Sequence, residues 1–344
     1  MPQKSIREAI NEALLLEMRR DPSVFLIGED IVGGAGGKGE EVDPWGGVMG
    51  VTKGIYGEFP DRIIDTPISE MAYIGAAVGA AVSGMRPVAE LMFCDFIGCC
   101  LDQVMNQAAK LRYMVGGKAE VPLVIRMQMG GGFSAACQHS QSLYPLFAHI
   151  PGLKVVVPSN AYDAKGLLIT AIRDNDPVMF FEHKGLYDDK DEVPDGDYSI
   201  PFAEARFARD GSDITIVATG RMVKFAIEAA DQLASEGIAC TVLDPRTVSP
   251  FDEISFIESL EETGRLLVVE EAYPFCSFAS EVAAIAAQKA FYALSQPVRL
   301  LTPPHTPIPF APELESAYFP DAERIAGSVR EMLDAAAPKR GAAA

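Results

Sequence analysis

Residues 65–93 read DTPISEMAYIGAAVGAAVSGMRPVAELMF, and this stretch decides the fold. After Ser69 and Glu70, Ala, Gly and Val recur at helical spacing, which predicts a helix over 71–83. The apolar run PVAELMF at 87–93 follows at once, and a continuous apolar run indicates a strand that is buried on both faces. A helix that leads directly into a buried strand is typical of a parallel α/β sheet.

The same alternation extends in both directions along the chain. Further apolar runs occupy 23–28, 121–127, 153–159 and 177–183, and helical patterns occupy 6–20, 99–114 and 161–173. After a polar, acidic segment the pattern restarts, with strands predicted at 213–219, 238–244, 265–271 and 297–303 and helices at 222–236, 251–262, 277–292 and 321–336. We therefore predict an α/β protein with domains at 1–185 and 204–338, a linker at 186–203 and a loose tail at 339–344.

Composition narrows the class of protein. The chain has 344 residues, and its 29 basic against 48 acidic residues give a net charge of −19, which disfavours nucleic acid and anionic membranes as partners. No apolar run reaches the roughly 18 residues that cross a bilayer. The N-terminal pattern interleaves acids and resembles no targeting peptide, so we expect a cytoplasmic protein. The six cysteines lack CxxC spacing and are expected to be reduced and mostly buried, with neither zinc nor disulfides.

Two residues stand out as candidates for chemistry. Glu70 is either a first-turn acid beside the helix dipole, with Ser69 as N-cap, or a carboxyl in an apolar cleft that exchanges a proton, and the residues alone leave both open. His139 follows a Gly-rich turn in GGGFSAACQHSQSLY, a loop position that suits proton transfer. The helix behind Glu70 carries a stripe of small residues that would admit a second backbone, namely Ala72, Gly75, Ala76, Gly79, Ala80 and Ser83.

Other motifs argue against competing functions. The Gly-rich stretch VGGAGGKGE at 32–40 lacks GxGxxG or GxxxxGK[ST] spacing, which disfavours a nicotinamide or P-loop enzyme and leaves its role open. The sequence contains no GxSxG motif, which argues against a hydrolase. The remaining histidines, His149, His183 and His305, are expected to have structural roles.

Several motifs occur together in one order: GED (28–30), DTPISE (65–70), GMRPVAELMFCDF (84–96), DQVMNQAAKLRYMVGG (102–117), QHSQS (138–142), HIPGLKVVVPSNAYDAKGLL (149–168) and AIRDNDPV (171–178). With them, residues 4–335 closely resemble the beta subunit of thiamine-diphosphate-dependent 2-oxo acid dehydrogenases of the alpha2beta2 type. Within that family, DPWGGVMGVTKGIYGEF, AELMFCDFIG and PPHTPIPF look most like the acetoin dehydrogenase beta subunit.

The resemblance implies a fold and a set of partners. The fold is a parallel-sheet thiamine-diphosphate pyrimidine-binding domain followed by a smaller transketolase-C-terminal-like domain. The partners are an alpha subunit in an alpha2beta2 heterotetramer, a second beta subunit, and a dihydrolipoyl acyltransferase that carries a lipoyl arm. The alpha subunit would hold Mg²⁺ on the diphosphate through a GDG…N motif, which this chain lacks.

The resemblance also implies roles for individual residues. Glu70 would hydrogen-bond the aminopyrimidine ring nitrogen of the cofactor, and His139 would assist proton transfer. The pyrimidine pocket would be formed by Ile68 and Phe96 packing on the ring, Met92 lining the same pocket, and Glu29 in support. Branched-chain members have Gln where Met92 stands, which counts against a branched-chain substrate. A potassium ion would be held by Leu123, Ala171, Ile172, Asp174 and Asp176, although a plain helix C-terminal turn is the alternative.

The expected reaction is cleavage of acetoin, with transfer of the two-carbon unit to lipoamide. A pyruvate or branched-chain 2-oxo acid dehydrogenase beta subunit is the alternative within the same chemistry. A scaffold subunit without catalysis is the alternative of another class, and the presence of both Glu70 and His139 disfavours it.

Overall fold

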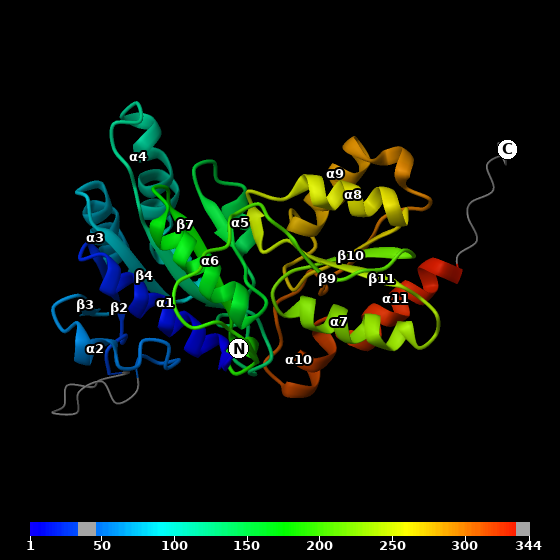
Figure 1. Cartoon of the computed structure of the whole chain (residues 1–344), viewed down its shortest axis with the longest axis horizontal. Helices are drawn as coiled ribbons and strands as arrows, with labels where there is room; N and C mark the ends of the chain where they lie inside the picture. Colours follow the sequence, from blue (N-terminus) through cyan, green and yellow to red (C-terminus); the bar gives the residue numbers. More distant parts are fainter. Residues whose placement is uncertain (34–45, 335–344) are drawn as a thin grey trace. The chain divides into compact units, whose positions relative to one another are not determined.

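The computed structural model describes residues 1–33 and 46–334, so most of the Gly-rich stretch 32–40 and the whole predicted tail 339–344 lie outside the described residues. The chain divides into two compact units (Figure 1). The first unit comprises Met1–Gly131, Gln138–Phe202 and Thr247–Pro250, and the second comprises Gly132–Cys137, Ala203–Arg246 and the chain from Phe251 onward. None of the helices within 1–33 and 46–334 is long and apolar enough to cross a membrane.

A seven-stranded sheet organises the described part of the first unit. Its order is β12 (Thr247–Ser249), β6 (Lys154–Val156), β7 (Val178–His183), β5 (Val124–Met129), β4 (Arg86–Phe93), β2 (Val24–Glu29) and β3 (Ile63–Thr66). All neighbours run parallel except β12, which joins the edge antiparallel to β6. Every residue of β5 and β7 is buried, as the continuous apolar runs predict. A small antiparallel pair, β1 (Gln3–Ser5) with β8 (Lys190–Glu192), completes the strands of this unit that the structure describes.

Helices of the first unit follow local sequence signals. The helix α1 (Ile6–Arg20) begins at a capping box in which Ser5 and Glu8 bond each other's backbone amides. It packs against α6 (Ala161–Arg173), which begins at the N-cap Asn160. The remaining helices are α2 (Ile55–Glu58), α3 (Glu70–Val82), α4 (Ala109–Met114) and α5 (Tyr144–Ala148). The helix predicted at 99–114 is not one regular α-helix, because a π-helical segment, Gln103–Ala108, precedes α4.

The two faces of α3 differ. Tyr73, Ile74 and Val78 are buried against the sheet side of the helix. Within the predicted small-residue stripe, by contrast, Ala72, Ala76, Gly79 and Ser83 are exposed. The helix therefore presents a smooth surface to the outside of this single chain.

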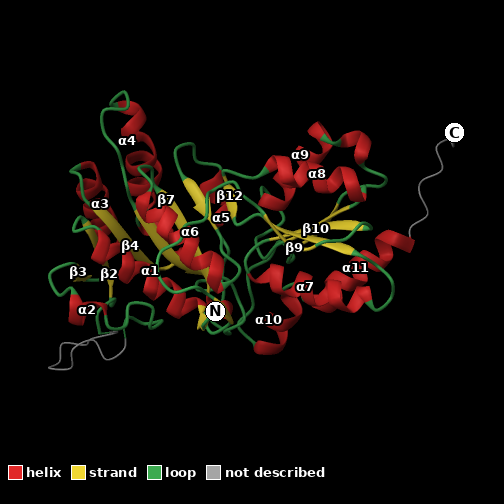
Figure 2. Cartoon of the chain, viewed as in Figure 1, coloured by secondary structure: helices red, strands yellow, loops and turns green. Residues whose placement is uncertain are grey.

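The second unit is a smaller α/β layer structure (Figure 2). Its sheet has the order β14 (Arg299–Leu301), β13 (Leu266–Val269), β10 (Ile214–Ala218), β11 (Cys240–Asp244) and β9 (Arg206–Arg209), with only β9 antiparallel among the described strands. The helices α7 (Arg221–Ala234) and α11 (Ala322–Asp334) pack together, as do α8 (Glu253–Thr263) and α9 (Phe278–Lys289), and the short α10 (Pro312–Tyr318) follows β14.

The predicted α/β architecture with parallel sheets is confirmed. The sequence patterns did not predict the short strands β1, β3, β8, β9 and β12, because three or four residues carry too little periodicity. The cysteine prediction is partly wrong. All six are free, but Cys99 and Cys276 are exposed and Cys137 is partly exposed, so only half of them are buried.

Candidate functional site

Carboxyl groups gather at the carboxyl ends of β2 and β3. Glu29 ends β2 and pairs in register with Thr66, which ends β3, and α3 then begins at Glu70. Burial raises the pKa of Glu29, and the charges of Asp30, Glu70 and Asp65 raise it further. We call Glu29, Asp30, Asp65 and Glu70 the acidic edge. The carboxyl end of a parallel sheet is where ligands of α/β proteins bind.

The N-terminal end of α3 bears on the two interpretations of Glu70. Ser69 occupies the N-cap position, but its side chain accepts no capping hydrogen bond. Glu70 itself is half-buried at the first turn, with Glu29 close enough for mutual repulsion. The side-chain cap expected from Ser69 is therefore absent, while Glu70 keeps the first-turn position that the helix dipole favours.

An aromatic group lies beyond the end of the neighbouring strand β4. The His139 ring meets the edges of two phenyl rings, with centroid distances of 5.2 Å to Phe93 and 5.4 Å to Phe96. Phe96 belongs to the 3-10 helix Cys94–Cys99, which follows β4 directly. Edge-to-face geometry of this kind is favourable between aromatic rings and holds the imidazole in place. The structure thus brings together Phe96 and His139, two of the predicted site residues.

A buried lysine contacts both the His139 loop and the Phe93 ring. Lys184 Nζ donates a hydrogen bond to the His139 carbonyl and lies 4.9 Å from the centre of the Phe93 ring. The lysine follows β7, and only 4% of it is exposed. Sequence analysis missed Lys184, although a basic residue directly after the predicted strand 177–183 is a signal that could have found it. The turn that opens the His139 loop needs Gly130, because its φ is +89° and a Cβ there would lie 2.0 Å from His183 Nε2.

A second set of charges, also missed from sequence, lies inside the sheet. Arg126 on β5 is 1% exposed and donates to Glu182 on β7 at 2.6 and 2.8 Å and to Glu90 on β4 at 2.8 Å. Tyr187 donates to Glu182 at 2.7 Å. We call these four residues the buried ion cluster. Burial raises the pKa of Glu182, while Arg126 and the Tyr187 hydroxyl act against that rise.

The chain is similar to known proteins over nearly its whole length. Two family models match the chain, the pyrimidine binding domain of transketolase at residues 2–190 and the transketolase C-terminal domain at 203–325. The beta subunit of acetoin:2,6-dichlorophenolindophenol oxidoreductase from Cupriavidus necator is 60% identical over 96% of this chain and 97% of its own length. Its counterpart from Bacillus subtilis is 55% identical, and the 2-oxoisovalerate dehydrogenase beta subunit of the same species is 42% identical over 97% of this chain and its whole length.

The chain belongs to this family of dehydrogenase beta subunits. The family is thiamine-diphosphate-dependent. A solved split-gene transketolase, described as an inactive beta4 tetramer, shares the fold with a TM-score of 0.75 over 96% of this chain and 98% of its own, at 23% identity. The predicted transketolase-like fold is confirmed.

The remaining predicted pocket residues of this beta subunit are spread over its first unit. Met92 is buried near the end of β4. Ile68, two residues before Glu70, is 76% exposed and covers no ring in the single chain. The roles of the predicted site residues stay predictions.

The predicted potassium loop of this beta subunit is a turn crowded with basic side chains. Arg86 donates to the carbonyls of Ile172 and Asp174 at 3.0 and 2.9 Å. Lys154 Nζ bonds both carboxylate oxygens of Asp174, at 2.6 and 2.7 Å. The Leu123 and Ala171 carbonyls accept backbone amides of Val178 and Asp174. Among the described residues, no group of three or more His, Cys, Asp or Glu side chains could hold a metal ion.

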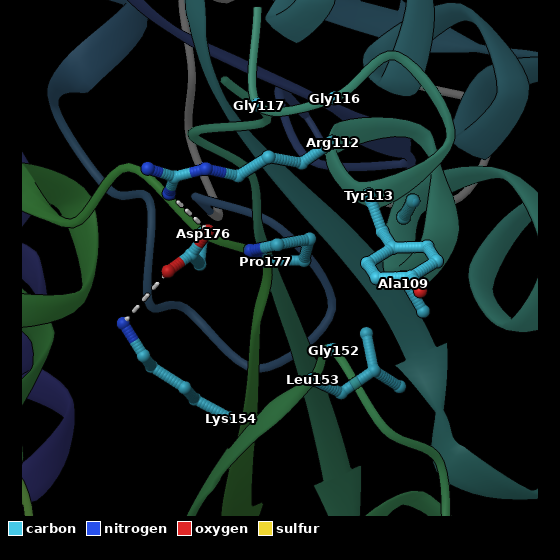
Figure 3. A pocket seen from close by; sticks show the side chains of 11 residues that line it. Ala109, Arg112, Tyr113, Gly116, Gly117, Gly152, Leu153, Lys154, Asp176 and Pro177 are labelled. Atoms are coloured by element: carbon cyan, nitrogen blue, oxygen red, sulfur yellow. Dashed lines mark hydrogen bonds and ion pairs between the residues drawn. The ribbon is translucent and has the colours of Figure 1, made fainter. Parts of the chain in front are cut away.

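A cavity of about 710 Å³ in the first unit lies beside this loop and away from the acidic edge. Figure 3 shows Arg112 and Lys154 both reaching Asp176 on its wall. Burial raises the pKa of Asp176, but these two basic side chains outweigh it and lower the pKa below its usual value. Of the predicted site residues, only Asp176 lines this cavity, so its size does not mark the catalytic site.

Proposed function

We propose that this chain is the beta subunit of a thiamine-diphosphate-dependent dehydrogenase component that cleaves acetoin and passes the two-carbon unit to a lipoyl group on an acyltransferase. The observation that carries the proposal is the near full-length similarity to acetoin oxidoreductase beta subunits, at 60% and 55% identity. Beta subunits that are named for 2-oxo acids are less similar, at 42% and 40%.

The residues at the acidic edge fit the pyrimidine end of the cofactor. An aminopyrimidine needs a carboxyl group at its ring nitrogen and apolar surface against its faces. Glu70 is a half-buried carboxyl, and Phe96 and Met92 supply apolar surface at the end of the neighbouring β4. Among the described residues, Thr66 Oγ1 and Tyr73 OH are buried without hydrogen-bond partners, which also favours a polar ligand at this edge.

Each of these side chains has a distinct role in the proposal. Glu70 bonds the ring nitrogen and exchanges a proton there, with Glu29 in support. His139, held against Phe93 and Phe96, moves a proton at the substrate oxygen. When bound, the thiamine group supplies the electron sink for carbon–carbon cleavage.

The proposal also assigns the ions. The diphosphate and its Mg²⁺ belong to the alpha partner. A potassium ion would bind the Leu123, Ala171, Ile172 and Asp174 carbonyls together with Asp176. Each carbonyl oxygen has a second lone pair beyond the bond it already accepts.

Partner contacts follow from the exposed surface of α3 and α4. Beside the smooth face of α3, Ile68 and Met71 are 76% and 60% exposed, and Tyr113 and Met114 near the end of α4 are 89% and 71% exposed. Exposed apolar groups of this number are typical of protein interfaces. We assign this surface to the alpha subunit and a second beta subunit of an alpha2beta2 heterotetramer.

Reconstitution tests the proposal directly. The chain is purified together with its alpha partner and assayed with thiamine diphosphate, Mg²⁺ and 2,6-dichlorophenolindophenol as electron acceptor. We expect reduction of the dye with acetoin and much slower reduction with pyruvate or a branched-chain 2-oxo acid. Turnover of pyruvate without acetoin would overturn the substrate. If no substrate turns over and Glu70→Ala leaves cofactor affinity unchanged, the chain is a scaffold.

A further inference from the structure

A buried tyrosine beside Glu70 has no partner for its hydroxyl group. Tyr73 lies one helical turn after Glu70 on α3, and 3% of it is exposed. Its OH makes no hydrogen bond within the part of the chain that the structure describes, and neither does Thr66 Oγ1 at the end of β3. A phenylalanine ring would fill nearly the same space without the free-energy cost of a buried, unpaired hydroxyl.

The surroundings of this hydroxyl are acidic. Burial raises the pKa of Tyr73 far above its usual value, and the charge of Glu70 is the next largest contribution, followed by Cys100, Glu29 and Glu90. The phenol therefore stays protonated, so that it can donate a hydrogen bond. Carboxylate oxygens of the acidic edge are the acceptors in its neighbourhood.

The helix directs Tyr73 toward one of these acceptors. Residues three apart on a helix are neighbours on one face, which places Glu70 and Tyr73 side by side. A carboxyl that must present one oxygen to a ligand needs its other oxygen fixed, and a hydrogen bond from a rigid phenol does this. No hydrogen bond joins the two groups within the described residues, so a contact between them requires the half-buried Glu70 side chain to move.

We propose that Tyr73 is a positioning residue for Glu70, whose carboxyl group it holds by a hydrogen bond so that the opposite oxygen faces the pyrimidine ring. The inference rests on the proposed function of Glu70. It extends that function to a residue whose burial alone would suggest only a core side chain.

The test uses Tyr73→Phe in the assembled enzyme. We expect thiamine diphosphate affinity, measured by isothermal titration calorimetry, to fall about tenfold, the usual worth of a hydrogen bond to a charged group. We expect kcat to fall by a similar factor while KM for acetoin stays within about twofold, since the pocket for acetoin is intact. The melting temperature of the chain without its partner should stay the same or rise, because a hydroxyl that is unpaired among the described residues is removed. The matched control Tyr187→Phe removes a hydroxyl that is bonded to Glu182, and its melting temperature should fall.

A double-mutant cycle separates the inference from the proposed function. If Tyr73 acts through Glu70, then Tyr73→Phe has little further effect on cofactor affinity in a Glu70→Gln background. Additive losses, or wild-type affinity and kcat in Tyr73→Phe, overturn the inference and leave Glu70 in place. Wild-type affinity and turnover in Glu70→Gln overturn the proposed role of Glu70, and the inference with it.

Discussion

The acidic edge and the buried ion cluster both place carboxyl groups on the same sheet, but their partners differ. Inside the sheet, Glu90 and Glu182 share the guanidinium of Arg126, so two buried negative charges have a cation between them. At the edge, Glu29 has no ion pair among the described residues and is surrounded by three further carboxyl groups. Among the described residues, the carboxyl groups of the buried ion cluster are paired, whereas those of the acidic edge lie together without a cation, where we propose that the cofactor binds.

Glu70→Gln is expected to produce the largest change in turnover, and it tests whether the acidic edge takes part in catalysis. Gln keeps the size of the side chain but cannot exchange the proton, so turnover should fall by about 100-fold to 10,000-fold. The melting temperature of the chain and its assembly with the alpha subunit should stay close to wild type, because Glu70 makes no structural ion pair in the described residues. Near-normal turnover would show that the unpaired acid is not part of the chemistry.

The second test removes the cation of the buried cluster. Arg126→Met leaves two buried carboxylates unpaired, and we expect the free energy of unfolding to fall by about 3–5 kcal/mol in urea titrations. Arg19→Met is the matched control, because Arg19 also bonds Glu58 through two nitrogens but is exposed on the same unit. An exposed pair is worth about 0–1 kcal/mol, so equal losses in the two variants would contradict the comparison.

The acidic edge and the buried ion cluster differ in how far the sequence could predict them. Glu70 was identifiable because an acid at the start of a small-faced helix is a local pattern, and His139 because it follows a Gly-rich turn. Arg126, Glu90 and Glu182 were not identified, since they lie on three strands whose pairing order has no local signature. The parallel sheet could be predicted for the same reason as Glu70. Each continuous apolar run is a local pattern that lies within one segment of the sequence.

Lys184 and β12 are two further features that local sequence patterns could not predict. The contact of Lys184 with the His139 carbonyl joins residues 45 positions apart. Thr247 of β12 pairs with Val156 of β6, 91 positions earlier, so neither contact could be predicted from a short segment of sequence. The potassium loop adds a different case. Residues 171–176 lie at the end of α6, whereas Leu123 directly precedes β5. Arg86 at the start of β4 donates to the Ile172 and Asp174 carbonyls, and only the fold reveals that neighbour.

The smallest expected effect concerns Glu29 and the pH dependence of stability. Burial and the neighbouring carboxylates raise the pKa of Glu29 in the folded chain above the value of 4.5 for a free side chain. The folded state therefore favours the protonated form, and the stability contributed by this group is present below pH 4.5 and lost as pH rises through the folded pKa. Glu29→Gln mimics the protonated form, so it should stabilise the chain slightly at pH 7.

The pH dependence of the stability gained by Glu29→Gln tests this prediction. Thermal unfolding of Glu29→Gln and wild type between pH 4 and pH 8 should show a difference that is near zero at the acid end and grows as pH rises. The charges of Asp30, Glu70 and Asp65 contribute to the raised pKa of Glu29, so they add to the slope. Asp61→Asn, an exposed acid on the same unit, is the control and should show no such growth. A difference that shrinks with pH would mean that folding stabilises Glu29 as a carboxylate, which would contradict the raised pKa of Glu29.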